Sequence, residues 1–128
     1  MSLVEAYVGE IRLFAGTTEP RGWAFCDGRL LNSSENRLLS AVLGATYGGD
    51  GRTTFALPDL RGRVPIHPSE GDWLGQASGG ELVATSTEVN SAQTTSTLTL
   101  NYMICLTGVI PDRSQAPDGQ STTRPWAE

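Results

Sequence analysis

The chain has 128 residues, which fits a single domain with one modest hydrophobic core. Its nine basic residues are all Arg and its formal net charge is −5, so neither a basic surface for nucleic acid nor a catalytic or phosphate-binding lysine is available. The 15 glycines exceed the usual share of about 7% and favour a turn-rich fold that contains β-structure.

The first predicted element is a β-strand over residues 7–15. Small or apolar residues occupy its odd positions, Tyr7, Gly9, Ile11, Leu13 and Ala15, while Glu10 and Arg12 fall between them. This period of two is typical of a half-buried strand with its odd positions toward the core. Within residues 23–31, two short apolar runs then flank Asp27-Gly28, a pair that tolerates the positive φ angles of a tight turn. We therefore expect a small hairpin there.

One helix is predicted to follow. Residues 32–35 (Asn-Ser-Ser-Glu) have the composition of a helix N-terminus, with Glu35 available for a capping box. Four apolar residues share one helical face, and Gly44 is placed to end the helix: Leu38, Leu39, Val42 and Leu43. A helix of about ten residues is marginal alone and has to dock on the sheet.

The second half of the chain is predicted to be mostly irregular until its last strand. A glycine-rich loop spans 45–54, and the prolines at 58 and 65 make residues 55–66 extended but unsuited to a central strand. Residues 82–89 are a weaker strand candidate. The alternation over residues 98–107 predicts a strand at the centre of the sheet. The fold class expected is α+β, with a small antiparallel β-sheet, one short α-helix and long ordered loops rich in Gly and Pro.

The sequence gives little support for a catalytic site or a metal-binding site. His67 is the only histidine, and a catalytic set of Cys26, His67 and Asp59 is conceivable. Almost any chain with a Cys, a His and an Asp allows such a set, so it is weak evidence for catalysis. We therefore predict that the protein is not an enzyme and has no metal or cofactor. Cys26 and Cys105 are either two half-buried thiols or a disulfide. The aromatic residues Trp23, Phe25, Tyr47 and Phe55 form either part of the core or a platform on which a sugar stacks.

The two ends of the chain carry separate expectations. No apolar run approaches the roughly 18 residues that cross a bilayer, and the N-terminus lacks the pattern of a secretion signal. We expect synthesis in the bacterial cytoplasm without membrane insertion. The domain is predicted to span 1–111. Residues 112–128 form a polar extension that is either flexible or docks on a partner, and Trp126 is the candidate anchor, on a partner or on its own domain.

A series of motifs in order resembles the phage tail-collar domain family, whose bacterial members are often called microcystin-dependent proteins. The resemblance runs from about Tyr7 to Gly80 and resumes over residues 98–111. The motifs that carry it are Gly9-Glu10-Ile11-Arg12, Phe14-Ala15-Gly16, Pro20-Arg21-Gly22-Trp23-Ala24-Phe25-Cys26-Asp27-Gly28, Leu43-Gly44, Tyr47-Gly48-Gly49-Asp50-Gly51 and Thr54-Phe55-Ala56-Leu57-Pro58-Asp59-Leu60-Arg61-Gly62-Arg63-Val64-Pro65.

The resemblance implies a homotrimeric structural component of a phage tail fibre, baseplate or tail-like particle, assembled into a virion tail or an extracellular particle. Its partners would be other tail proteins and a host surface receptor or glycan. The residues that it marks as structural or assembly determinants are Trp23, Cys26, Asp27, Gly28, Tyr47, Gly48, Gly49, Asp50, Gly51, Phe55, Pro58, Asp59, Arg61, Gly62 and Arg63.

Two alternatives stay open beside this reading. The charged residues Asp27, Asp59, Arg61 and Arg63 are expected to tie irregular segments together, either within the chain or across a threefold interface. Longer relatives carry an insertion with a His-x-His pair that is implicated in metal binding, and here residues 90–97 bridge that gap without a histidine. This departure favours an assembly role over receptor binding. The alternative function is an adhesin or lectin-like module that binds a cell-surface glycan.

Overall fold

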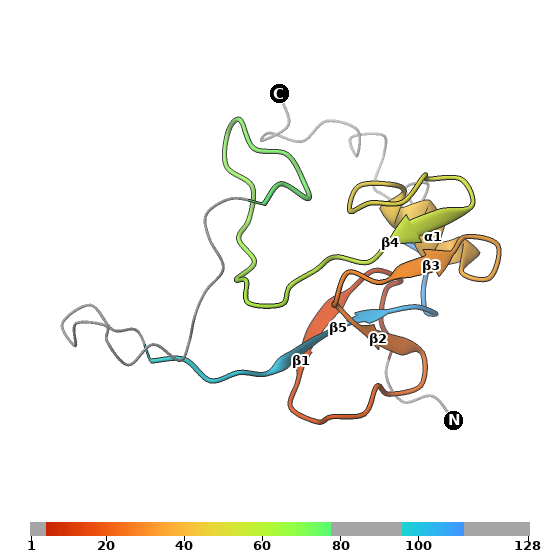
Figure 1. The fold of residues 1–128 in the computed structure, drawn as a ribbon. Coiled ribbons are helices and arrows are strands. Elements are labelled where there is room, and N and C mark those ends of the chain that lie inside the picture. The colour runs from red at the N-terminus through yellow and green to blue at the C-terminus, as the bar shows by residue number, and fades with distance from the viewer. Residues whose placement is uncertain (1–4, 78–95, 112–128) are drawn as a thin grey trace, which may run out of the picture.

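The computed structural model describes residues 5–77 and 96–111, which contain five strands and one helix (Figure 1). The strands are β1 (Ile11–Phe14), β2 (Trp23–Phe25), β3 (Leu30–Asn32), β4 (Thr54–Ala56) and β5 (Asn101–Cys105), and the helix is α1 (Arg37–Leu43). They form a three-stranded sheet in the order β1-β5-β2 and a two-stranded sheet of β3 and β4. Every strand pair is antiparallel, which confirms the predicted α+β class with small antiparallel sheets and one helix.

Strand β5 lies at the centre of its sheet, as its alternating sequence predicts. Ile104 stands opposite Ile11 of β1 on one side and Ala24 of β2 on the other. Its side chain is fully buried. The last strand of the chain thus joins two strands from its beginning, and this pairing closes the domain.

Strand β1 is shorter than predicted and its apolar side chains are not covered. A four-residue turn precedes it, closed by a hydrogen bond from the Glu10 N–H to the Tyr7 carbonyl, with Gly9 at φ 92° in the third position. Burial along the strand alternates with a period of two, but in the phase opposite to the prediction: Arg12 and Phe14 are half-buried, whereas Ile11 and Leu13 are 38% and 55% exposed. Both share a face with the core residue Ile104, because opposed residues of antiparallel strands point to the same side. They remain exposed because β1 is an edge strand and contributes no residue to the main core cluster.

The predicted hairpin around Asp27-Gly28 is wrong, although both of its strands exist. Strand β2 pairs with β5, and β3 pairs with β4 instead of with β2. The chain at Asp27-Gly28 leads from one sheet into the other, and Asp27 forms an isolated antiparallel bridge with Asp59. Local turn chemistry is overridden here, since pairing with distant strands buries Ala24 and Phe55 in one core.

Helix α1 has seven residues, fewer than the ten expected, and begins later. The Asn32 side chain closes a local turn, because its Oδ1 accepts hydrogen bonds from the Ser34 N–H at 2.8 Å and the Ser34 hydroxyl at 2.6 Å. Asn36 becomes the N-cap without a side-chain hydrogen bond, so the expected capping box with Glu35 does not form. Gly44 ends the helix as predicted, and its N–H donates to the Ser40 carbonyl.

The core lies where α1 meets the two sheets. Its buried members come from every layer: Val8, Ala24, Cys26, Leu39, Leu43, Phe55, Leu57 and Ile104. Within the predicted apolar face of α1, Leu39 and Leu43 are buried whereas Leu38 and Val42 are 45% and 40% exposed. Only half of that face therefore packs on the core.

Four further expectations concern the rest of the chain. Residues 54–56 form strand β4, so the expected irregular stretch begins only after Ala56. Cys26 and Cys105 are both free and buried, and burial raises the pKa of the Cys26 thiol to about 12 and that of the Cys105 thiol above its ordinary value. The strand candidate at residues 82–89 lies outside the described residues. Within the described ranges, no helix has both the length and the apolar character needed to span a bilayer.

Candidate assembly site

Several of the residues that the sequence singles out meet where the chain passes from one sheet to the other. The first cluster there is centred on Arg29, which follows Asp27-Gly28. Its Nε and Nη2 donate to the two oxygens of Asp27, each at 2.9 Å, and Nη2 also donates to Glu19. Glu19 in turn accepts the backbone N–H of Phe25 at 2.8 Å. The cluster thus ties the loop before β2 to the segment that leads into β3.

Both carboxylates of this cluster are held in the ionised form. Hydrogen bonds from the Arg29 side chain lower the pKa of Asp27, and the hydrogen bond from the Phe25 N–H, followed by that from Arg29, lowers the pKa of Glu19. Sequence reasoning missed Glu19 and Arg29. A signal was present for Arg29 because it stands two residues after Asp27, the same spacing as Asp59 and Arg61, but nothing local pointed to Glu19.

A second Asp-Arg pair with the same spacing lies beside the first. Asp59 accepts hydrogen bonds from Nε and Nη2 of Arg61, each at 2.8 Å, and these bonds lower its pKa to about 2. Arg63 donates from Nη1 to the Asp59 carbonyl oxygen at 3.0 Å. The interactions lie within one chain, although the Arg61 side chain is 69% exposed.

Backbone contacts bring the two Asp-Arg pairs together. Asp27 and Asp59 form an antiparallel bridge, and the Leu60 N–H donates to the Cys26 carbonyl at 2.9 Å. The Gly28 N–H donates to the carbonyl of Pro58 at 3.2 Å. A Cβ atom on Gly28 would lie 3.1 Å from the Asp59 side chain, so the close approach favours glycine at this position.

The glycine-rich loop after α1 is organised by Asp50. Its Oδ1 accepts the backbone N–H groups of Arg52, Thr53 and Thr54 at 2.8 to 2.9 Å, and its Oδ2 accepts the Thr53 hydroxyl at 2.6 Å. These hydrogen bonds, that of the Thr53 hydroxyl first, hold the pKa of Asp50 well below its ordinary value. The loop leads directly into β4 and sets the position of Phe55.

Glycine is required in this loop by conformation and by space. Gly49 has φ 88°, and a Cβ atom there would lie 2.5 Å from the Cα of Phe55. All five glycines that the sequence marked adopt positive φ angles: Gly28, Gly48, Gly49, Gly51 and Gly62.

The marked aromatic residues do not form one exposed platform. Phe55 is fully buried and Tyr47 packs against the core cluster. Trp23 is half-buried, and the guanidinium of Arg12 lies 5.3 Å from the centre of its ring. That guanidinium also pairs with Glu10 at 2.9 Å. Trp126 lies outside the described residues.

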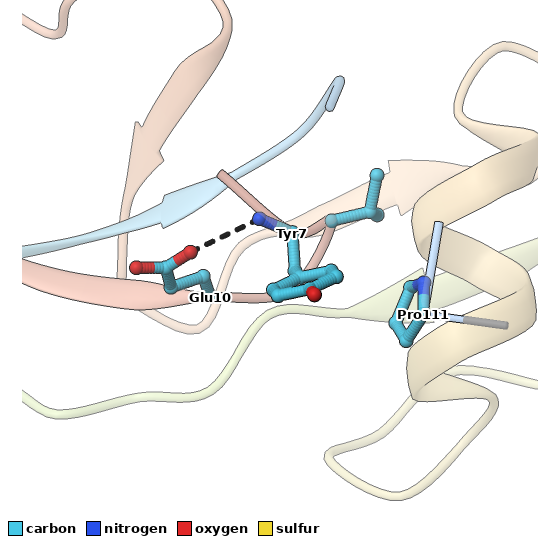
Figure 2. Close-up of a pocket in the computed structure, with 5 residues that line it drawn as sticks. Tyr7, Glu10 and Pro111 are labelled. Atoms are coloured by element: carbon cyan, nitrogen blue, oxygen red, sulfur yellow. Dashed lines mark hydrogen bonds between the residues drawn. The ribbon is translucent and has the colours of Figure 1, made fainter. Parts of the chain in front are cut away.

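An open hollow lies where the N-terminal turn meets the end of the described chain (Figure 2). It has a volume of about 540 Å³ and is lined by Tyr7, Val8, Gly9, Glu10 and Pro111. Glu10 accepts the backbone N–H of Tyr7 at 3.0 Å, which fixes the turn that forms the hollow. We call this feature the N-terminal hollow. Among the described residues, no three His, Cys, Asp or Glu side chains gather closely enough to hold a metal ion.

The described residues form a small α+β domain whose ion pairs and glycine turns fix its own loops. Residues 9–65 match the family model for the Phage Tail Collar Domain. This part of the chain is therefore similar to the phage tail collar domain, and it contains both Asp-Arg pairs and the Asp50 loop. No curated protein matches the chain.

Proposed function

We propose that the protein is a homotrimeric, non-enzymatic collar or tip element of a tail fibre, baseplate or phage-tail-like particle. The observation that carries the proposal is the collar-family match over residues 9–65. The same residues hold the contacts that fix the irregular segments: the Arg29 cluster, the Asp59 and Arg61 pair, and the Asp50 loop. The proposed mechanism is geometric, since a rigid module repeated by symmetry presents the same surface several times at a fixed spacing.

The partners proposed are other copies of this chain and other tail, fibre or baseplate proteins. The assembled particle would lie outside the cell in which the chain is made. Contact with a host receptor or glycan would then be made by the particle, and the Asp-Arg pairs would serve to keep the domain rigid. Their intrachain geometry supports this division of roles.

The mass of the full chain in solution tests the proposal. Multi-angle light scattering over a wide range of protein concentrations should show trimers, and electron microscopy of particles that contain the chain should place it at a collar, fibre tip or baseplate. A monomer at every concentration that is also absent from such particles would contradict the proposal. Reproducible binding on a glycan array by that monomer would favour an adhesin instead.

A further inference from the structure

Residues 61–77 form an arm with unusual exposure. Every residue of this segment is exposed, and Figure 1 shows the segment, in green, projecting away from the sheets. Four large apolar side chains lie on it, Val64, Ile66, Trp73 and Leu74, with exposed fractions of 61%, 79%, 67% and 64%. Four large apolar side chains exposed within 17 residues are a concentration that often marks a contact with another protein.

The arm is nevertheless shaped by specific contacts. The Ser69 N–H donates to Asp72 Oδ2 at 2.8 Å, and the Trp73 N–H donates to Gln76 Oε1 at 3.1 Å. Gly75 lies against the loop after α1, where a Cβ atom would be 2.9 Å from the Thr46 side chain. Trp73 is therefore held in a formed turn with its side chain outside the core. A residue fixed in this way loses little conformational freedom when it binds a partner.

The N-terminal hollow is the complementary feature on the same chain. Its lining is mostly apolar, and Val8 at its base is buried. Around it lie Tyr7, Val42, Val109 and Ile110, which are 40% to 57% exposed. Tyr7 forms a backbone bridge with Val109, and a Cβ atom on Gly9 would lie 3.0 Å from Val42, so these residues make one continuous rim. The hollow is open, and its volume of about 540 Å³ exceeds that of an indole ring.

We infer that Trp73 of one copy inserts into the N-terminal hollow of a neighbouring copy, with the rest of the arm covering the rim. The inference rests on the proposed homotrimer and names the surfaces that form it. Each copy then donates one arm and receives one. A contact between two different surfaces of identical chains is heterologous, and it closes into a ring when the rotation per copy allows.

The available area supports a second copy as the occupant. The four apolar side chains of the arm offer on the order of 500 Å², against roughly 800 Å² per partner in a stable interface. The arm thus supplies more than half of one side of such an interface. Tryptophan is enriched among the residues that dominate binding energy, which makes Trp73 the central contact.

Two single variants and their mixture test the inference. In the full-length chain, Trp73→Ala removes the inserted side chain and Tyr7→Ala opens the hollow. Each should weaken self-association by roughly 30-fold or more, measured as the concentration of half-assembly in sedimentation or light scattering. Because each variant keeps the surface that the other lacks, mixing the two should produce a species with the mass of two chains. Neither variant alone should form it.

Matched controls separate this contact from other causes. Leu13→Ala removes another apolar side chain, 55% exposed on β1 and outside the interface, and should leave association unchanged. Trp126→Ala tests whether the C-terminal extension fills the hollow instead, and it should also leave association unchanged. The thermal midpoint of each variant measured as a monomer reports folding, and Ile110→Ser at the rim replaces Tyr7→Ala if the latter unfolds.

The outcomes also distinguish the inference from the proposed function. Trimers that persist in both variants would overturn the arm-and-hollow contact and leave the homotrimer standing. A loss of association caused by Leu13→Ala or Trp126→Ala, but not by Trp73→Ala, would place the contact elsewhere and overturn it as well. A wild-type monomer at every concentration would remove the homotrimer and the inference together.

Discussion

Asp50 shows how a single exposed carboxylate can organise a glycine-rich loop. Its two oxygens accept three backbone N–H groups and one hydroxyl from the residues that lead into β4. Apart from Ala45 and from Tyr47, which packs against the core cluster, the loop consists of glycine and polar residues. The hydrogen bonds to the carboxylate therefore fix the backbone of this loop, as the hydrogen bonds of a helix or strand would. Because the loop is fixed, Phe55 is placed in the core.

We expect Asp50→Ala to lower the thermal midpoint by several degrees, because four hydrogen bonds to the carboxylate are lost. The effect should depend on pH. The pKa of Asp50 is lowered in the folded protein from its ordinary value of 3.8, so its stabilising contribution is complete above about pH 4 and is lost as the pH falls through the folded pKa. Calorimetry at a series of pH values should therefore show the gap between wild type and variant closing in acid.

Asp72→Ala is the matched control for this prediction. Its carboxylate accepts one backbone hydrogen bond, from Ser69 in the exposed arm, and its removal should change the midpoint little. A gap between wild type and Asp50→Ala that stays constant from pH 7 into acid would show that the charge of Asp50 contributes nothing.

At the scale of elements, α1 is stabilised by its packing and not by its length. Seven residues without a side-chain cap are too few for an independent helix. Leu39 is fully buried against the sheets, whereas its neighbour Leu38 is 45% exposed. The two leucines have the same chemistry and helix propensity, and they differ only in what they contact.

We expect Leu39→Ala to destabilise the fold by about 2–5 kcal/mol and Leu38→Ala by less than about 1 kcal/mol. The first leaves a cavity among Phe55, Leu57 and Ile104, and the second removes a side chain that is largely in water. Urea unfolding at one fixed protein concentration measures both, because association would otherwise contribute to the difference. Equal losses for the two variants would contradict the assignment of the buried face.

At the scale of the whole molecule, the core cluster of the described residues draws on most of the length of the domain. All members of the main cluster lie between Val8 and Ile104. We propose that residues 112–128 lie outside the folded domain and serve docking in the assembled particle, with Trp126 as the contact residue. The polar composition of this segment supports the proposal.

Deleting residues 112–128 should shift the thermal midpoint by no more than about 2 °C, because every member of the described core cluster lies outside that segment. Incorporation of the shortened chain into particles should fall, as measured by its copy number relative to the full-length chain in purified particles. Trp126→Ala in the intact chain should reproduce part of that loss. A large drop in the midpoint would instead make the extension part of the domain.

Much of the candidate site could be predicted because its features are local in the sequence. The five marked glycines need positive φ angles in turns of a few residues, and an aspartate with an arginine two positions later can pair within its own loop. The alternation of residues 98–107 likewise predicts β5, since a period of two requires no knowledge of the partners. By itself, the sequence determined the α+β class and the central strand, and it carries the resemblance to the collar family over residues 9–65.

Tertiary structure alone decided which strands pair, which apolar residues remain exposed and which distant groups meet. Strands β2 and β3 do not pair with each other, because pairing with β5 and β4 buries more surface. Ile11 and Leu13 remain exposed to water because β1 is an edge strand. Glu19 reaches Arg29, and Tyr7 meets Pro111, only after the chain has closed. Burial and pairing depend on the whole set of contacts, and no single segment contains that information.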